Sequence, residues 1–94
     1  MQFEWHAHKD RRNQLKHRVS FETATLVFSD PHALSLFDRI EGDEERWHTI
    51  GMAGGILLLL VAHTFRGTYG DERIRIFSAR KATAQERHAY EENL

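Results

Sequence analysis

The chain is built around Gly55-Ile56-Leu57-Leu58-Leu59-Leu60-Val61-Ala62-His63-Thr64-Phe65, which contains its only long unbroken apolar run. That run, residues 56–62, is far shorter than the roughly 20 residues that a membrane-spanning helix needs. Glycines precede it, a glycine-containing loop follows it, and Thr64 and Phe65 favour extended structure. We therefore expect a strand that is buried on both faces.

A strand buried in this way needs a neighbour on each edge, and the chain offers two. Residues 45–51 precede the apolar run, residues 73–80 follow it, and the turn on each side contains glycine. Strands joined by such turns pair most simply as an antiparallel meander. We predict an antiparallel β-sheet with the apolar run at its centre.

The N-terminal part of the chain supplies a short strand and two helices. Residues 2–5 alternate polar and apolar side chains, as a half-buried strand does. Residues 6–17 favour a helix by propensity, and because Ala7 and Leu15 are nearly its only apolar residues, it should lie on the surface with one narrow contact stripe. Ser20 is a good N-cap for a second helix, which ends before Pro31.

The rest of the chain completes an α+β domain. Residues 32–40 predict a strand that leads into an acidic loop. Residues 83–86, Thr-Ala-Gln-Glu, have the form of a capping box, so a helix should run from Ala84 to about Glu92. We expect one domain over residues 1–94, with two N-terminal helices and one C-terminal helix on one face of the sheet and the other face free.

Composition narrows the class of protein. The chain has 94 residues, 40% of them hydrophobic and 29% charged, with a formal net charge of −1 at pH 7. These values are ordinary for a globular domain. There are no cysteines, which excludes disulfides and thiolate metal sites. The N-terminus lacks a basic segment followed by an apolar one, so we expect a cytoplasmic protein without a signal peptide.

Charge is unevenly distributed along the chain. Residues 6–18 contain five Lys or Arg and a single acid, and residues 73–81 contain four Lys or Arg and no acid. The acids gather in residues 38–45 and at the C-terminal end. A basic surface could form if the two basic segments meet in space. The alternative is that both are simply solvated faces of the domain.

The last predicted strand carries the strongest signal for anion binding. Its period of two sends Ile74 and Ile76 to one face and Arg73 and Arg75 to the other. Arg80 and Lys81 follow beside the start of the last helix, and guanidinium groups suit phosphate oxygens. In the alternative interpretation, these arginines form surface ion pairs with nearby acids, namely Asp71, Glu72 and Glu86.

Seven histidines are present, but their spacing gives no metal-binding motif, and we expect no metal or cofactor. His63 in the central strand and His48 in its neighbour could each transfer a proton, because an imidazole titrates near neutral pH. Either could equally be a structural group whose hydrogen bonds are satisfied. Glu44, near Arg46, could supply a carboxylate base, or could belong simply to an acidic loop.

Three blocks occur in order along almost the whole chain: Phe3-Glu4-Trp5 with Lys9, Asn13 and Lys16-His17-x-Val19-Ser20-Phe21-Glu22; Glu44-x-Arg46 with Ile50-Gly51; and Arg73-Ile74-Arg75-Ile76 with Ser78-Ala79-Arg80 and Glu86-Arg87. Together they resemble the BrnT family of bacterial type II toxins. The resemblance implies a compact RelE/ParE-like fold and a ribonuclease that inhibits translation and growth by cutting RNA without a metal. It also implies a BrnA-like antitoxin with a ribbon-helix-helix domain, through which the complex binds promoter DNA.

Two positions depart from the family pattern. The family usually has Asp where His6 stands, at the start of the first predicted helix, and His is a poorer cap. It usually has Gly where Arg18 stands, at what we expect to be a left-handed helix end that disfavours a Cβ.

The resemblance gives the candidate site residues their roles. In a metal-free ribonuclease the RNA 2′-hydroxyl is the nucleophile, and the protein stabilises the added negative charge and moves protons. We assign charge stabilisation to Arg80 and Lys81, supported by Arg46 and Arg75. Glu44 is the first candidate for proton transfer and His63 the second. The residues expected to contact RNA are Lys16, His17 and Arg73.

Two other functions are compatible with the same open basic face. The chain could be a non-catalytic module that binds a protein partner or DNA. It could also be a ParE-like toxin that acts on DNA gyrase and needs no ribonuclease site. Toxicity that depends on single Arg or Glu residues, together with cleaved RNA, would distinguish the ribonuclease from both.

Overall fold

A computed structural model describes residues 1–94 of the chain. The elements follow in the order β1 (Gln2–Glu4), α1 (Ala7–His17), α2 (Phe21–Thr25), a 3₁₀ turn η1 (Leu26–Ser29), β2 (Leu34–Glu41), β3 (Glu44–Ala53), β4 (Leu57–Thr64), β5 (Arg73–Lys81) and α3 (Ala84–Glu92). The fold class is α+β, as predicted. No helix is long and apolar enough to cross a membrane.

The five strands form one sheet in the order β1-β5-β4-β3-β2. The central position of β4 between β3 and β5 is confirmed, and the pairs β2–β3, β3–β4 and β4–β5 are antiparallel. The prediction of a wholly antiparallel sheet is wrong at one edge, because β1 pairs with β5 in parallel. The two strands lie at opposite ends of the chain, so no tight hairpin forces them to run in opposite directions.

Burial on both faces of β4 is confirmed. Leu59 and Val61 pack with Phe21 and other residues of the α2 segment, whereas Leu58 and Leu60 pack with Ile50 and Tyr90. Ile56 is an exception: it lies in the β3–β4 turn and is 87% exposed. That turn takes two glycines with positive φ, so the strand begins only at Leu57.

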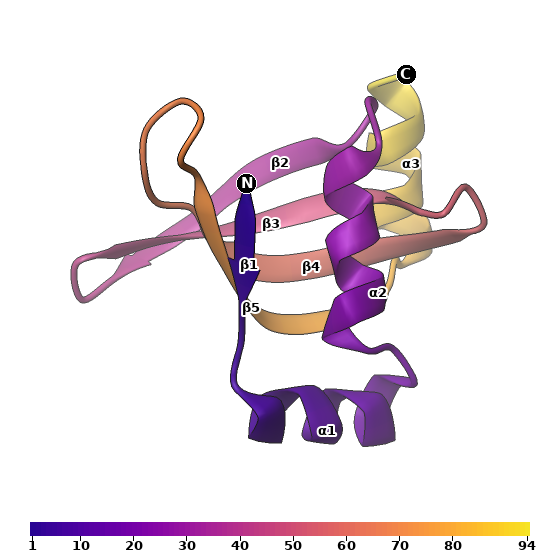
Figure 1. The fold of residues 1–94 in the computed structure, drawn as a ribbon. Helices are drawn as coiled ribbons and strands as arrows, with labels where there is room; N and C mark the ends of the chain where they lie inside the picture. The colour runs from indigo at the N-terminus through magenta and orange to yellow at the C-terminus, as the bar shows by residue number, and fades with distance from the viewer.

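The helices do not share one face of the sheet, and the prediction that they do is wrong. In Figure 1, α2 lies in front of the sheet, α3 lies behind it, and α1 lies beside the β5 edge. The reason is that β4 presents a buried apolar row on each side, and each row needs its own cover. We call the two sides the α2 face and the α3 face. The α3 helix covers only one end of its face, as its packing against Ile50 and Leu58 indicates.

Helix α1 is attached to the sheet by a polar side chain and not by the apolar contacts that the sequence predicted. Leu15 is 86% exposed, and Asn13 is the helix's one buried residue. The Asn13 amide donates to the carbonyl oxygens of Val19 and Ala79, each at 2.8 Å, and accepts from Ala79 N at 3.1 Å. The side chain therefore pairs with the free edge of β5 as another strand would.

Helix α3 is fixed to the α3 face by a partly buried hydroxyl–carboxylate pair. The Tyr90 hydroxyl donates to the Asp30 carboxylate at 2.6 Å, and Met52 N donates to the same oxygen at 2.8 Å. The hydrogen bond to Asp30 raises the pKa of Tyr90 to about 12. Burial raises the pKa of Asp30, but the hydrogen bonds from Met52 and Tyr90 outweigh it and lower that pKa overall.

Arg18, which stands at the end of α1 where the family usually has Gly, has the left-handed conformation that was expected. Its backbone is left-handed (φ 59°, ψ 31°), and it is the one non-glycine residue with positive φ. This conformation costs a residue with a Cβ roughly 1–2 kcal/mol. Glycine avoids this strain, but it gives back part of the gain in stability because its unfolded state has more conformational entropy. We expect Arg18→Gly to raise the free energy of unfolding by about 0.5–1 kcal/mol in chemical denaturation. Arg18→Ala is the matched control, because it removes the same charge and keeps the strain. An equal gain in both variants would show that charge, and not backbone strain, is responsible.

Candidate active site

The uncovered part of the α3 face carries most of the candidate catalytic residues. Arg46 and His48 of β3 lie on this face, because the intervening Trp47 and Thr49 belong to the α2 face with His63. In β5, the buried Ile74 and Ile76 point to the α2 face, as predicted, which leaves Arg75 on the α3 face.

A β-bulge in β5 shapes this surface. Ser78 pairs with Ala62, and Ile76 pairs with His63, so Phe77 is an extra residue in the strand. Ile76 and Ala79 both belong to the α2-side core. Phe77 and Ser78 are therefore presented together on the α3 face.

Three cations gather over the ring of Phe77. The guanidinium carbon of Arg46 lies 4.2 Å from the ring centroid, that of Arg75 lies 5.1 Å away, and Lys9 Nζ lies 5.2 Å away. Each such contact contributes about 0.5–1 kcal/mol at an exposed site. The aromatic ring thus holds positive charges from α1, β3 and β5 in one place.

Acidic side chains orient two of these arginines. Arg75 Nη2 donates to both carboxylate oxygens of Glu44, at 2.6 and 2.7 Å, and the Arg75 side chain is 28% exposed. Arg46 Nη1 lies 3.1 Å from Glu41, while its Nε is buried and has no hydrogen-bond partner. Both guanidinium groups are therefore held in place beside solvent.

His48 lies next to Arg46 over a shallow hollow of about 170 Å³. Its Nε2 is 3.7 Å from Asp38 Oδ2, and its side chain is 36% exposed. The residues that line the hollow are Asp38, Arg39, Arg46, Trp47, His48, Ala62, His63, Phe77 and Ser78.

A basic groove of about 550 Å³ meets the hollow at Phe77 and Ser78, which line both. We call it the α1 groove; its residues are Lys9, Arg12, Asn13, Leu15, Lys16, His17, Phe77 and Ser78. Lys16 and His17 were expected to contact RNA, whereas Lys9 and Arg12 were not singled out. The sequence held the signal for them, because Lys9, Arg12 and Lys16 are spaced by three and four residues and so share one helix face.

Arg80 is held by an acid, in agreement with the alternative interpretation of the sequence. Its guanidinium makes two hydrogen bonds to Glu86, at 2.8 and 2.9 Å, and Glu86 completes the predicted capping box with Thr83. The hydrogen bond from Arg80 lowers the pKa of Glu86 from its ordinary value of 4.5 to about 2, and the pair raises the pKa of Arg80.

The Arg80–Glu86 pair should make stability depend on pH. Because the pKa of Glu86 is lower in the folded chain, its contribution is fully present above about pH 4.5 and is lost as the pH falls through about 2. We expect the free energy of unfolding to fall more steeply between these values in the wild type than in Glu86→Gln. The excess should be no more than about 1 kcal/mol, because both side chains are partly exposed. Gln still completes a capping box, so parallel pH profiles of urea unfolding would contradict the assignment.

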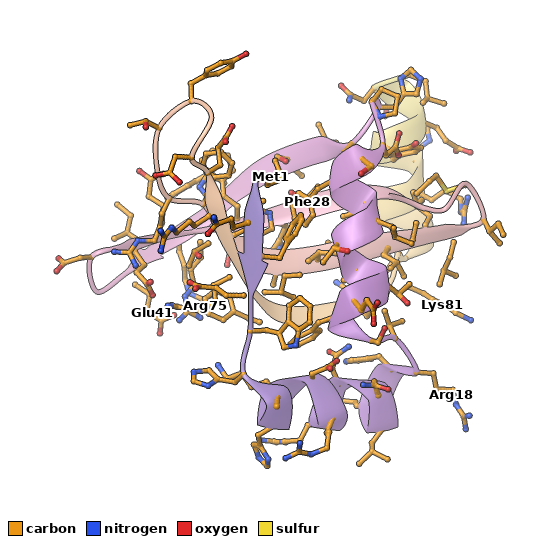
Figure 2. The ribbon with its side chains drawn as sticks, viewed as in Figure 1. Met1, Arg18, Phe28, Glu41, Arg75 and Lys81 are labelled. Carbon is orange, nitrogen blue, oxygen red and sulfur yellow. The ribbon has the colours of Figure 1, made fainter.

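The structure does not bring every predicted site residue together. Figure 2 shows Arg75 and Lys81 toward opposite ends of the sheet. Lys81 is exposed at the end of β5, and Arg73 is exposed at its start. The predicted set is therefore divided between the hollow, the α1 groove and the two ends of β5.

His63 borders the hollow, but its imidazole points away from these cations, to the α2 face. Its ring packs edge-on against Phe28, in front of the sheet, with centroids 4.9 Å apart. Nδ1 donates to the Thr64 carbonyl at 2.8 Å, and Nε2 accepts from the Thr49 hydroxyl at 2.7 Å. Burial lowers the pKa of His63, which is 2% exposed. The imidazole is thus neutral with both nitrogens occupied, and we leave it out of the site.

A basic groove that opens into an arginine-lined hollow is typical of proteins that bind a polyanionic chain. Comparison with known families narrows this class. The family described as "Ribonuclease toxin, BrnT, of type II toxin-antitoxin system" matches residues 5–86. The chain therefore belongs to the BrnT family of ribonuclease toxins. An antitoxin partner and an RNA target follow from membership of such a system.

A solved structure agrees with this assignment at the level of the fold. The crystal structure of the Brucella abortus ribonuclease toxin BrnT is similar to this chain with a TM-score of 0.59 and 24% identity. The match covers 88% of this chain and 97% of that one. The comparison with curated proteins gives no match. No group of three or more His, Cys, Asp or Glu side chains is arranged to hold a metal ion.

Proposed function

We propose that this chain is an endoribonuclease that needs no metal and that inhibits translation and growth by cutting RNA. The observation that supports this most is the gathering of Arg46, Arg75 and Lys9 around Phe77, beside the hollow and at the end of the α1 groove. Such a cluster supplies the positive charge that a phosphodiester needs in the transition state. The groove offers a path for the RNA strand on one side of that phosphate.

In this mechanism the RNA supplies its own nucleophile. The 2′-oxygen forms a bond to the phosphorus, the bond from phosphorus to the 5′-oxygen breaks, and a 2′,3′-cyclic phosphate results. Arg46 and Arg75 stabilise the extra negative charge on the phosphate oxygens. Arg80, on the same face of β5 two residues beyond Ser78, contributes further positive charge, and Arg73 extends it toward the start of the strand. Lys81 pairs with Leu59 and so lies on the α2 face, where it contributes only to the general positive charge of this end of β5.

His48 is our candidate for taking the 2′-hydroxyl proton, with Asp38 orienting its ring. The sequence favoured Glu44 for this step, but both of its carboxylate oxygens accept hydrogen bonds from Arg75. We therefore propose that Glu44 positions Arg75, and that the leaving 5′-oxygen takes its proton from solvent.

We also propose which partners this chain has and where it acts. A BrnA-like antitoxin with a ribbon-helix-helix domain would neutralise the toxin, and the complex would bind promoter DNA through the antitoxin. We propose that the complex acts in the bacterial cytoplasm.

The decisive experiment incubates the purified chain with naked RNA in excess chelator. We expect cleavage with 5′-hydroxyl and 2′,3′-cyclic phosphate ends, which mass spectrometry of the fragments identifies. Intact RNA from a folded chain, both with and without ribosomes, would overturn the proposal. Gyrase inhibition by the same sample would then favour the ParE-like alternative.

The basic residues of the α1 groove lead to a separate prediction about RNA affinity. Replacing Lys9, Arg12 and Lys16 together by alanine should weaken binding to single-stranded RNA and flatten its salt dependence. If each cation contacts one phosphate, the slope of log Kd against log salt concentration should fall by roughly 2. Fluorescence anisotropy over a salt series measures this slope. Arg11→Ala, on the same helix and outside the groove, is the matched control. An unchanged slope in the triple variant would exclude the groove as the RNA path.

A further inference from the structure

Strand β2 forms one free edge of the sheet. It is the last strand on its side, pairs only with β3, and is exposed at every position after Leu34. Three of its large apolar side chains face solvent: Leu36 is 46% exposed, Phe37 51% and Ile40 66%. The first half of the strand, residues 34–37, contains no Pro and no charged residue, which are the residues that commonly prevent pairing at an edge.

The opposite edge of the sheet is protected against pairing with another strand, whereas residues 34–37 of β2 are not. There β1 is only three residues long, and beyond it the Asn13 side chain occupies the backbone groups of Ala79. A bulge at Asp38 interrupts the pairing of β2 with β3, so the regular part of the free edge is residues 34–37. That length suits a short added strand.

The two faces of β2 differ in chemistry. Phe37 stacks edge-on against Trp47, with centroids 5.5 Å apart, and Ile40 lies on the same side because its partner Glu45 bonds to Trp47. Leu36 is paired with His48, and Asp38 and Arg39 line the hollow. The β2 edge is therefore apolar on the α2 face and borders the candidate active site on the α3 face.

The end of this edge is acidic. Between residues 38 and 45 the β2–β3 hairpin carries five acids and one arginine, the acids being Asp38, Glu41, Asp43, Glu44 and Glu45. A segment that pairs with β2 would be favoured by apolar side chains facing Phe37 and Ile40 and by basic side chains near the hairpin. A second copy of this chain would bring another acidic hairpin, so charge favours a different partner.

We propose that an extended segment of the antitoxin, apolar at alternate positions and basic toward one end, adds to the sheet along β2. Its side chains on the α3 face would then lie beside Asp38 and Arg39 of β2, at the border of the hollow, and would obstruct access of RNA to it. This inference rests on the proposed function, since it assigns the surface by which the toxin is neutralised.

The test uses the full chain and its cognate antitoxin, co-expressed and then separated. Ile40→Lys should weaken antitoxin binding by about tenfold or more, because a charged edge residue opposes strand addition. Ile56→Lys is the matched control: Ile56 is 87% exposed in the β3–β4 turn, away from β2, and its variant should bind as the wild type does. RNA cleavage by the free Ile40→Lys chain should be unchanged, which separates failure of this inference from failure of the proposed function.

A second measurement needs no variant. In the wild-type complex, hydrogen exchange of the backbone amides in residues 34–37 should slow relative to the free chain. Binding of Ile40→Lys with wild-type affinity, or exchange in β2 at the rate of the free chain, would overturn the proposal. The proposal would also fail if the free wild-type chain dimerised through β2 and the monomeric Ile40→Lys chain still bound the antitoxin with full affinity.

Discussion

Replacement of Arg46 by alanine is expected to reduce the rate of RNA cleavage by about 10²- to 10³-fold, the usual cost of removing one group that stabilises transition-state charge. Arg46 borders the hollow, lies over Phe77, and has a buried Nε without a hydrogen-bond partner. Its guanidinium is therefore the positive group best placed to contact a phosphate there. Single-turnover cleavage of a short RNA measures the effect.

Two controls accompany the Arg46 variant. Arg46→Lys keeps the charge and loses the planar fork, so it should recover only part of the rate. Arg39→Ala removes a neighbouring arginine whose side chain is 57% exposed and paired with Asp38 and Glu41. We expect it to have a much smaller effect. A folded Arg46→Ala chain that cuts at the wild-type rate would remove Arg46 from the site and with it the proposed charge stabilisation.

The second large effect concerns stability. Asn13→Ala should lower the free energy of unfolding by about 3 kcal/mol, because it leaves the Ala79 amide and the Ala79 and Val19 carbonyls without partners in a buried position. For a domain of this size, that corresponds to a fall in Tm of roughly 10–20 °C, which calorimetry would detect.

The neighbouring Gln14 provides the control for Asn13. Its side chain makes only an exposed hydrogen bond to Asp10, so Gln14→Ala should change the free energy of unfolding by less than about 0.5 kcal/mol. Asn13→Asp should be at least as damaging as Asn13→Ala, because it removes both donors and adds a buried charge. If Asn13→Ala unfolds at the wild-type temperature, then α1 is held by contacts other than this amide.

The sequence by itself determined the features that depend on neighbouring residues. The apolar run predicted the central strand, Thr83 and Glu86 predicted the capping box that begins α3, and the alternation of residues 73–76 separated the isoleucines from the arginines. The blocks that resemble the BrnT family were sufficient to indicate the family, which the match over residues 5–86 confirms.

The tertiary structure alone decided which distant residues meet. The contact between Asn13 and Ala79 joins positions 66 residues apart, and that between Arg75 and Glu44 joins positions 31 apart. Such pairs depend on strand register and on the bulge at Phe77, which shifts side chains from one face to the other without any periodic signal in the sequence. For the same reason His48 and His63 could not be distinguished from the sequence. One residue's difference in register points an imidazole to the α3 face or buries it on the α2 face.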